Sequence, residues 1–104
     1  MTPFSTSLND SGSMNVTGDL TMYTIEKDWW KSASRHDLDA LKKQSNLTIC
    51  LSDIARIDSA GLAWLLNLIR DAKRAGLSIK LQNPPKELLN LAKISDASSL
   101  LPLE

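Results

Sequence analysis

The stretch Ile57-Asp58-Ser59-Ala60-Gly61-Leu62 follows an apolar, β-branched run at residues 47–51 and opens a helical pattern at residues 60–75. The first N–H groups of a helix have no partner within it, and the helix N-terminus carries partial positive charge. A carboxylate or hydroxyl here is therefore a helix cap, a contact point for a partner, or a place where a phosphate is favourable. We expect the turn to be exposed where the strand ends and to present Ser59.

Two further interpretations of this turn remain open. In the structural interpretation, Asp58 caps the helix and Gly61 lets two backbones approach closely. In the regulatory interpretation, Ser59 is a phosphorylation site, although its phosphate would meet the negative charge of Asp58.

Size and composition favour a single soluble domain. The chain has 104 residues, with 12 Lys and Arg balanced by 12 Asp and Glu, so it lacks the net positive charge typical of nucleic-acid binders. No apolar run reaches the length of a membrane span, and residues 1–12 do not resemble a secretory signal. The one cysteine, Cys50, cannot form an internal disulfide and lies in an expected buried strand. These features favour the cytosol.

The strand pattern predicts a hairpin followed by two further strands. Residues 2–8 and 13–17 form the hairpin, with a turn at residues 9–12, and Gly18-Asp19 closes the second strand. Residues 47–51 carry few charges and are predicted to form a central strand buried on both faces. Residues 77–81 alternate apolar and polar side chains, which is typical of a strand with one face nearer water.

Three helical regions are expected between and after these strands. Residues 21–44 are predicted to form one helix with Ile25 and Trp29 on its inner face, a break near His36, and a second short helix capped by Asp37. The best helix covers residues 60–75 and ends at Gly76. The last helix begins at Asn83-Pro84-Pro85, and its core-facing residues are Leu88, Leu91, Ala92 and Ile94. After it, Leu100, Leu101 and Leu103 are expected to pack onto the sheet.

The order is therefore β-β-α-β-α-β-α. Strands that alternate with helices predict an α/β fold with a mixed sheet of about four strands, flanked by helices.

The helix at residues 60–75 has an apolar stripe formed by Leu62, Leu65, Leu66 and Ile69. Trp64 lies nearly opposite this stripe, on the same side as Ala60, Asn67 and Asp71. We therefore expect Trp64 to be exposed and to form one docking patch with Ser59, since exposed tryptophan is a common interface anchor. The alternative is that Trp64 packs flat against a neighbouring helix or loop.

Nothing in the sequence points to an enzyme. Ser59 has no evident general base, because His36 is the only histidine and lies in an unrelated polar segment. One histidine and one cysteine do not make a soft metal site, and the carboxylates lack calcium-loop spacing. The four glycines are too far apart for a phosphate-binding loop. We expect no catalytic residue, metal or cofactor.

Three segments resemble the STAS domain family, which includes anti-sigma-factor antagonists and transporter-associated regulatory domains. They are the motif at residues 57–62, the following Leu62-Ala63-Trp64-Leu65-Leu66, and Val16-Thr17-Gly18-Asp19-Leu20. The resemblance extends to Leu101 and implies the STAS fold. The form DSAGLAxLL, its spacing to Gly76, and Asn83-Pro84-Pro85 are most similar to the small cytosolic STAS subunit of a phospholipid ABC transporter of Gram-negative bacteria.

This resemblance implies a non-catalytic subunit that binds and stabilises the ATPase of a transporter maintaining outer-membrane lipid asymmetry. Through the ATPase it would contact a permease complex, on the cytoplasmic side of the inner membrane and without inserting into it. In the family, the hydroxyl residue of the motif and the following helix form the contact surface. That role carries over to Ser59, with Asp58, Ala60 and Gly61 shaping the loop. The helix-face argument adds Trp64 and Asn67.

The alternative function is an anti-sigma-factor antagonist switched by phosphorylation of Ser59. The family commonly has Gly-Glu-Leu-Asp where this chain has Gly18-Asp19-Leu20-Thr21, so Thr21 replaces an acidic residue that helps shape the phosphorylation pocket. The central strand commonly carries Asp where this chain has Cys50. Both departures weaken the switch more than the docking function. A third function, a lipid shuttle, would need a sizeable apolar cavity, for which the sequence has no surplus of apolar residues.

Overall fold

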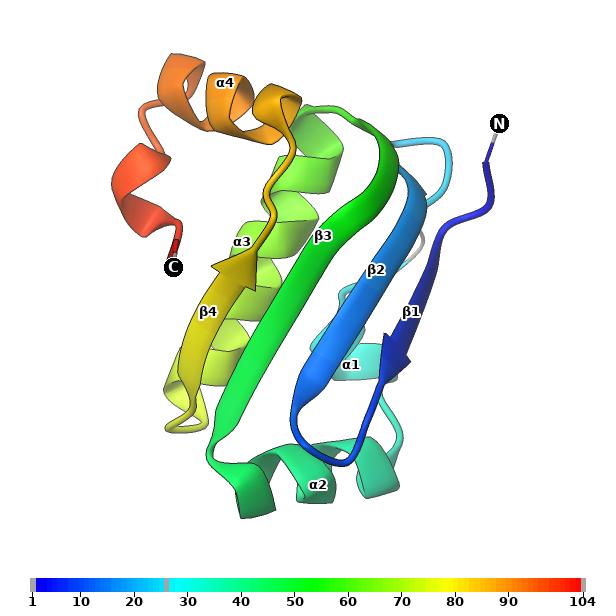
Figure 1. Ribbon diagram of the computed structural model, residues 1–104, viewed down its shortest axis with the longest axis vertical. Helices are drawn as coiled ribbons and strands as arrows, with labels where there is room; N and C mark the ends of the chain where they lie inside the picture. The colour runs from blue at the N-terminus through cyan, green and yellow to red at the C-terminus, as the bar shows by residue number, and fades with distance from the viewer. Residues whose placement is uncertain (1, 26, 104) are drawn as a thin grey trace.

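A computed structural model of the chain describes residues 2–25 and 27–103. Four strands form one sheet in the order β1-β2-β3-β4 (Figure 1). Their bounds are β1 Ser5–Leu8, β2 Ser13–Leu20, β3 Asn46–Ile57 and β4 Ser78–Gln82. β1 pairs antiparallel with β2, whereas β2, β3 and β4 run parallel to one another. The predicted mixed sheet of four strands is confirmed.

Helices cover one face of this sheet and both of its ends. The helices are α1 Trp29–Ser32, α2 Arg35–Gln44, α3 Ser59–Arg74 and α4 Lys86–Ile94, followed by the 3₁₀ helix η1 Ser98–Leu100. α1 and α3 lie behind the sheet in Figure 1, α2 lies below it and α4 above it. Among the described residues, no helix lies on the front face of the sheet in Figure 1. None of the helices within the described residues has the length and apolar character needed to cross a membrane.

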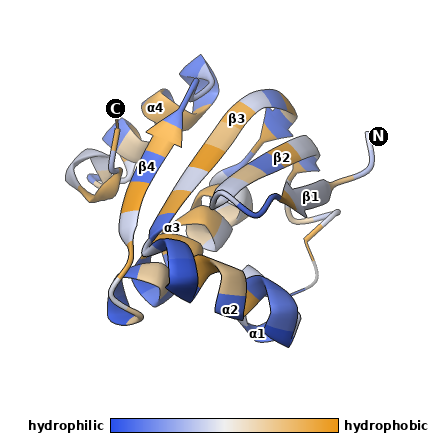
Figure 2. Ribbon diagram, turned by 60° about the horizontal axis from the view of Figure 1, so that its bottom comes forward, coloured by the Kyte–Doolittle hydropathy of each residue, from blue (hydrophilic) through white to orange (hydrophobic). Residues whose placement is uncertain are grey.

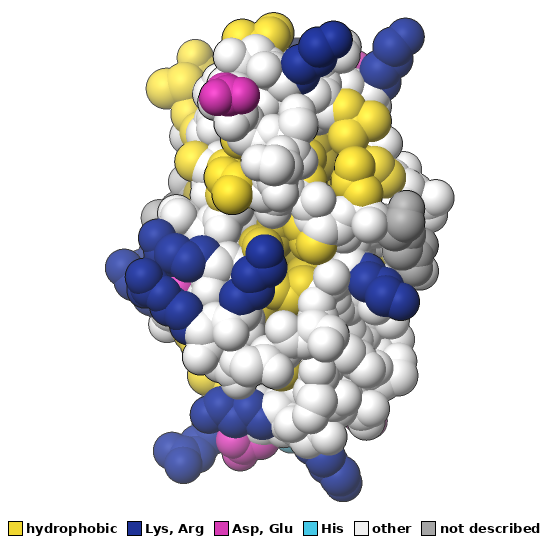
Figure 3. All heavy atoms as spheres, turned by 90° about the vertical axis from the view of Figure 1, so that its left-hand side faces the viewer, with side chains coloured by type: hydrophobic (Ala, Val, Ile, Leu, Met, Phe, Trp, Pro, Cys, Tyr) yellow, Lys and Arg dark blue, Asp and Glu magenta, His cyan; other side chains and the backbone are white. Residues whose placement is uncertain are grey.

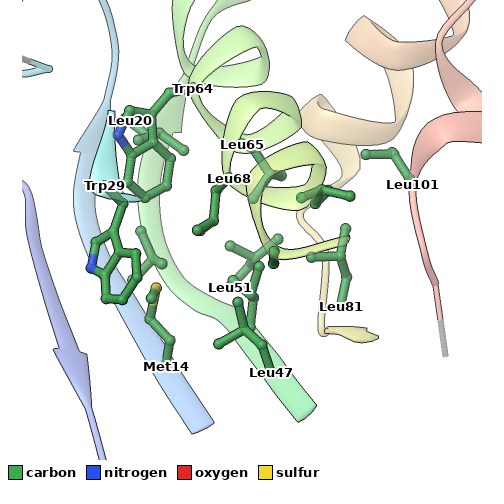
Figure 4. Close-up of a cluster of buried hydrophobic side chains, with 14 of the residues drawn as sticks. Met14, Leu20, Trp29, Leu47, Leu51, Trp64, Leu65, Leu68, Leu81 and Leu101 are labelled. Carbon is green, nitrogen blue, oxygen red and sulfur yellow. The ribbon is translucent and has the colours of Figure 1, made fainter. Parts of the chain in front are cut away.

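The core lies between the sheet and α3. The inward side chains of β3, which are Leu47, Ile49 and Leu51, pack with Leu65 and Leu68 of α3 (Figure 4). The intervening residues of β3 are partly exposed, and hydropathy alternates along the strand (Figure 2). The prediction that this strand is buried on both faces, with Cys50 inside, is wrong because helices cover only one face.

Both central strands are longer than predicted. β2 continues through Gly18-Asp19 to Leu20, and β3 continues beyond the predicted residues 47–51 to Ile57. The extra residues pair with one another in parallel, with Leu20 opposite Ile57. This extension was missed because Ser52 and Asp53 are polar. On a sheet face that no helix covers, polar side chains remain in contact with water and cost the strand little stability. Ile54 packs against the core.

The region from residue 21 to residue 44 contains a turn and two helices, with the break two residues earlier than predicted. α1 has only 4 residues, and Ile25 lies before it rather than on it. Ala33 is extended, and Ser34 caps α2 by accepting a hydrogen bond from the N–H of Asp37 at 3.1 Å. The assignment of Asp37 as the cap is therefore wrong. Ser34 was overlooked because the two helices were assumed to break at His36.

The last part of the chain largely follows the prediction. α3 ends at Arg74, and Gly76 has a φ of 84°, the left-handed conformation expected after a helix. In α4, Leu88 and Ala92 are buried, but Ile94 is 83% exposed, contrary to expectation. Of the three C-terminal leucines, only Leu101 is buried.

Candidate partner-binding surface

Asp58 joins two segments that are far apart in the sequence. Its Oδ1 accepts a hydrogen bond from the N–H of Gly61 at 3.0 Å, which caps α3. Its Oδ2 accepts one from the N–H of Met22, also at 3.0 Å. One carboxylate therefore holds the turn after β2 against the first turn of α3. The predicted cap is confirmed, and the second bond was not visible in the sequence.

Gly61 sits where no side chain fits. A Cβ built on it would lie 2.0 Å from the carbonyl oxygen of Leu20. The same carbonyl accepts a hydrogen bond from the N–H of Asp58 at 3.3 Å. The close backbone approach predicted for Gly61 is thus the contact between α3 and the end of β2.

The turn after β2 exposes two large apolar side chains. Met22 is 64% exposed and Tyr23 is 76% exposed. Thr24 fixes the turn by donating its hydroxyl to the carbonyl of Asp19 at 2.6 Å, and the N–H groups of Thr24 and Ile25 bond to the carbonyl of Thr21. The two side chains are therefore presented by an ordered turn beside Asp58.

Ser59 is the first residue of α3 and is exposed. Ala63, one turn further along the helix, is also exposed, whereas Ala60 is partly buried. The accessible start of the helix therefore consists of Ser59 and Ala63. Ser59 follows Asp58, which bonds to the turn that carries Met22 and Tyr23. We call Ser59, Ala63, Met22 and Tyr23 the Ser59 surface.

Trp64 is buried, and the prediction that it is exposed is wrong. It is 3% exposed, its Nε1 donates to the carbonyl oxygen of Lys27 at 3.1 Å, and its ring meets Phe4 edge to face at 5.2 Å. Figure 4 shows it on the side of α3 that faces Leu20 and Trp29. Ser59 and Trp64 do not form one patch.

The error has a geometric cause. α3 packs against the sheet and also against α1 and the chain before β1, so its buried side is wider than one apolar stripe. Besides the stripe, it includes Trp64, Leu68 and Ala72, while Leu66 of the predicted stripe is only partly buried. The exposed side of α3 is consequently not the one predicted. It includes Ser59, Ala63 and Arg70 rather than Trp64.

Asn67 also belongs to the packed side of α3. Its Nδ2 donates to Oδ1 of Asp28, the residue that precedes α1, at 3.2 Å. This bond and that of Trp64 both attach α3 to the start of α1. The structure thus brings Asp58, Ser59, Ala60 and Gly61 together at one helix end and gives Trp64 and Asn67 contacts within the fold.

A surface hollow of about 340 Å³ lies beside the Ser59 surface. Its lining includes Asp19, Thr21, Tyr23, Arg56 and Asp58. Thr21, at the position where the resemblance expects an acidic residue, therefore shares this hollow with Asp58, the residue before Ser59. Across the described part of the chain, no three His, Cys, Asp or Glu side chains gather in a way that would hold a metal ion.

Cys50 lies on the open face of the sheet, away from this surface. Its thiol is 3.3 Å from the hydroxyl of Ser52. Hydrogen bonds from the Ser52 side chain and backbone lower the pKa of Cys50. A hydrogen bond with the Asn83 side chain lowers this pKa further.

Sequence reasoning missed Met22 and Tyr23. They lie in a region expected to be helical, where apolar residues were assigned to an inner face. One signal was available: Gly18-Asp19-Leu20-Thr21-Met22-Tyr23-Thr24 has threonines flanking two apolar residues, and threonine hydroxyls favour turns.

The mixed four-stranded sheet and the capped helix after β3 define a fold shared with solved anti-sigma factor antagonists. SpoIIAA in its phosphorylated form, a Bacillus cell fate determinant, superposes with a TM-score of 0.60 over 97% of this chain and 90% of that chain, at 14% identity. The unphosphorylated form gives 0.56 over 88% and 82%, also at 14% identity.

A family model described as the MlaB-type STAS domain matches residues 5–102, and the chain belongs to this family. The intermembrane phospholipid transport system binding protein MlaB of Haemophilus influenzae is 33% identical over 89 residues, covering 83% of this chain and 81% of that protein. The anti-sigma-B factor antagonist of Bacillus subtilis is 28% identical over 89 residues, covering 85% and 76%.

Proposed function

We propose that this protein is a non-catalytic subunit of a phospholipid ABC transporter. It binds the ATPase subunit on the cytoplasmic side of the inner membrane and stabilises its assembled form. The family membership and the similarity to a phospholipid transport protein support the transport role. The observation that carries the docking role is the Ser59 surface.

The geometry of the Ser59 surface supports docking. Met22 and Tyr23 are large and exposed, and hydrogen bonds fix the backbone of their turn. A turn whose backbone is already ordered loses less conformational entropy on binding, and tyrosine is enriched among residues that dominate binding energy. Ser59 and Ala63 beside them are small, so a partner can approach the helix closely. Trp64 acts indirectly by holding α3 in place.

Binding of this kind can activate without chemistry. A subunit that binds only the competent conformation of the ATPase shifts the population toward that conformation. The domain then needs no nucleotide, metal or lipid of its own.

The test is copurification with the ABC ATPase encoded in the native host. Ser59→Arg and Tyr23→Ser should each weaken binding roughly tenfold or more, because a bulky cation blocks the helix start and loss of the ring removes an anchor. Ser7→Arg is the matched control, since Ser7 is exposed on β1 and distant from the Ser59 surface. It should bind as the wild type does.

Two results would contradict the proposal. One is an ATPase that does not bind the wild-type chain at all. The other is unchanged binding in both Ser59→Arg and Tyr23→Ser while circular dichroism shows that the variants are folded.

Phosphorylation of Ser59 is the second candidate function. The exposure of Ser59 at a helix start and the 28% identity to an anti-sigma-B factor antagonist favour it. Intact mass measurement on protein from the native host would detect the added phosphate. Ser59→Asp would then abolish binding to an anti-sigma factor, whereas the docking proposal expects no phosphate.

A further inference from the structure

The other end of α3 carries a groove that the Ser59 surface does not include. Its volume is about 450 Å³, and its lining is mostly apolar, from Leu66 and Ile69 of α3 and Leu100 of η1. Asn67 and the cations Arg70, Lys73 and Arg74 complete the lining. We call this the α3–η1 groove. Figure 3 shows the side of the molecule that carries the C-terminal segment, where hydrophobic side chains gather between Lys and Arg side chains.

The three charged residues that line the groove are all cations. Arg70 pairs with Asp71 at 3.3 Å, while neither Lys73 nor Arg74 forms an ion pair with any described residue. Cations in the last turn of a helix are favourable by themselves, so their presence alone proves nothing. α2 provides the comparison, because Lys42 and Lys43 occupy its last turn in the same way.

The surroundings of the two cationic ends differ. The surface hollow that includes Lys43 is also lined by Asp10 and Asp39. The α3–η1 groove has no acidic residue in its lining and adds three large aliphatic side chains. The helix dipole explains why cations lie at the C-terminal ends of both α2 and α3. It does not explain why an apolar groove lies beside the cations of α3 only.

The dimensions suit a short helix. From Leu66 to Arg74 α3 rises about 12 Å, which is roughly two turns of a partner helix lying along it. Amphipathic helices bind such grooves with apolar residues spaced by three or four positions. A membrane surface is a poorer fit, because Ile69 is only 3% exposed and recessed side chains do not insert into lipid.

We propose that the α3–η1 groove binds a two-turn amphipathic segment of the ATPase partner, with apolar side chains against Leu66 and Leu100 and acidic side chains facing Lys73 and Arg74. This inference rests on the proposed function and names the chemistry of a second contact. Arg70 lies about 16 Å along α3 from Ser59, so the two contacts can be removed separately.

The experiment measures binding of the full chain to the purified ATPase at low and at moderate salt. Lys73→Glu/Arg74→Glu should weaken binding about tenfold at low salt and remove most of its salt dependence. Leu66→Ser should weaken binding while the salt dependence stays. Lys42→Glu/Lys43→Glu is the matched control, and it should bind like the wild type.

The outcomes separate this inference from the proposed function. If Ser59→Arg abolishes binding and both groove variants bind normally, the groove proposal is wrong and the docking function stands. If no ATPase binding is found, both fail. A photo-crosslinker at Leu100 should attach to an ATPase segment with acidic residues beside apolar ones; attachment to a segment without them would overturn the inference.

A vesicle-binding experiment tests the alternative that the groove binds a membrane surface. Flotation with vesicles of phosphatidylethanolamine and phosphatidylglycerol should leave the wild-type chain unbound. Vesicle binding that is lost in Lys73→Glu/Arg74→Glu would instead assign the groove to anionic lipid and overturn the proposal.

Discussion

The two ends of α3 are built on different principles. The first turn is fixed by contacts: Asp58 bonds to two backbone N–H groups, and Gly61 lies against the carbonyl of Leu20. The last turn is fixed by conformation: Gly76 has a φ of 84°, and nothing lies within 4 Å of a Cβ added there. A glycine can therefore be required for two reasons: neighbouring atoms leave no room for a Cβ, or its own backbone conformation disfavours one. The tightly held end also carries the proposed docking residue.

The largest effect should come from the packed side of the first half of α3. Trp64→Ala removes a buried ring that contacts Phe4 and should cost about 3–5 kcal/mol of unfolding free energy. Urea unfolding measures this loss. Trp30→Ala, at a half-buried ring, is the control and should cost clearly less. Equal losses for the two tryptophans would contradict the burial of Trp64.

Gly61→Ala should be the next most damaging change. The added methyl group meets a backbone oxygen that cannot move without shifting β2, so we expect a loss of about 1–3 kcal/mol. This loss opposes the gain of about 1 kcal/mol that alanine normally brings to a helix. A variant more stable than the wild type in thermal unfolding would show that the contact with Leu20 is looser than the structure has it.

Asp58→Ala tests the carboxylate that joins the two segments. Loss of the cap should cost about 1–2 kcal/mol. Because the N–H of Met22 also loses its acceptor, hydrogen exchange at Met22 should become faster. Ser34→Ala removes only a cap, at α2, and should leave exchange at Met22 unchanged.

Gly76→Ala should cost about 1 kcal/mol, because the left-handed conformation disfavours a Cβ even in open space. The comparison between the two glycines depends on a second pair of variants. Gly76→Asn should recover part of the loss, since asparagine tolerates this conformation, whereas Gly61→Asn should be no better than Gly61→Ala. Recovery at both positions would mean that the two ends do not differ.

The smallest effect on stability should come from Ser59→Ala. Ser59 is exposed, so a change below about 0.5 kcal/mol is expected in urea unfolding. This would separate the docking residue from the residues that hold its helix. A loss as large as that of Asp58→Ala would indicate that Ser59 has a structural role.

Sequence patterns predicted local features, such as helix caps and helix ends, better than they predicted how wide the buried side of a helix is. The cap at Asp58, the helix after it and the stop at Gly76 depend on residues close together in the chain, and all three are confirmed. The ends of β2 and β3 were missed because each extension is supported by the other strand. Trp64 was misplaced because the segments that cover it come from residues 4 and 27, which a helical projection does not include.

The amino-acid sequence alone determined the fold class, the strand-to-helix turn at Asp58 and Ser59, and the resemblance to STAS domains. These features could be predicted because hydrophobic periodicity, helix capping and short motifs depend on residues that are close together in the chain. Only the tertiary structure decided which side of α3 reaches solvent, that Asp58 also holds the turn of Met22 and Tyr23, and that Leu66 and Leu100 share a groove. These features depend on contacts between distant segments, and their geometry follows from how the elements pack together.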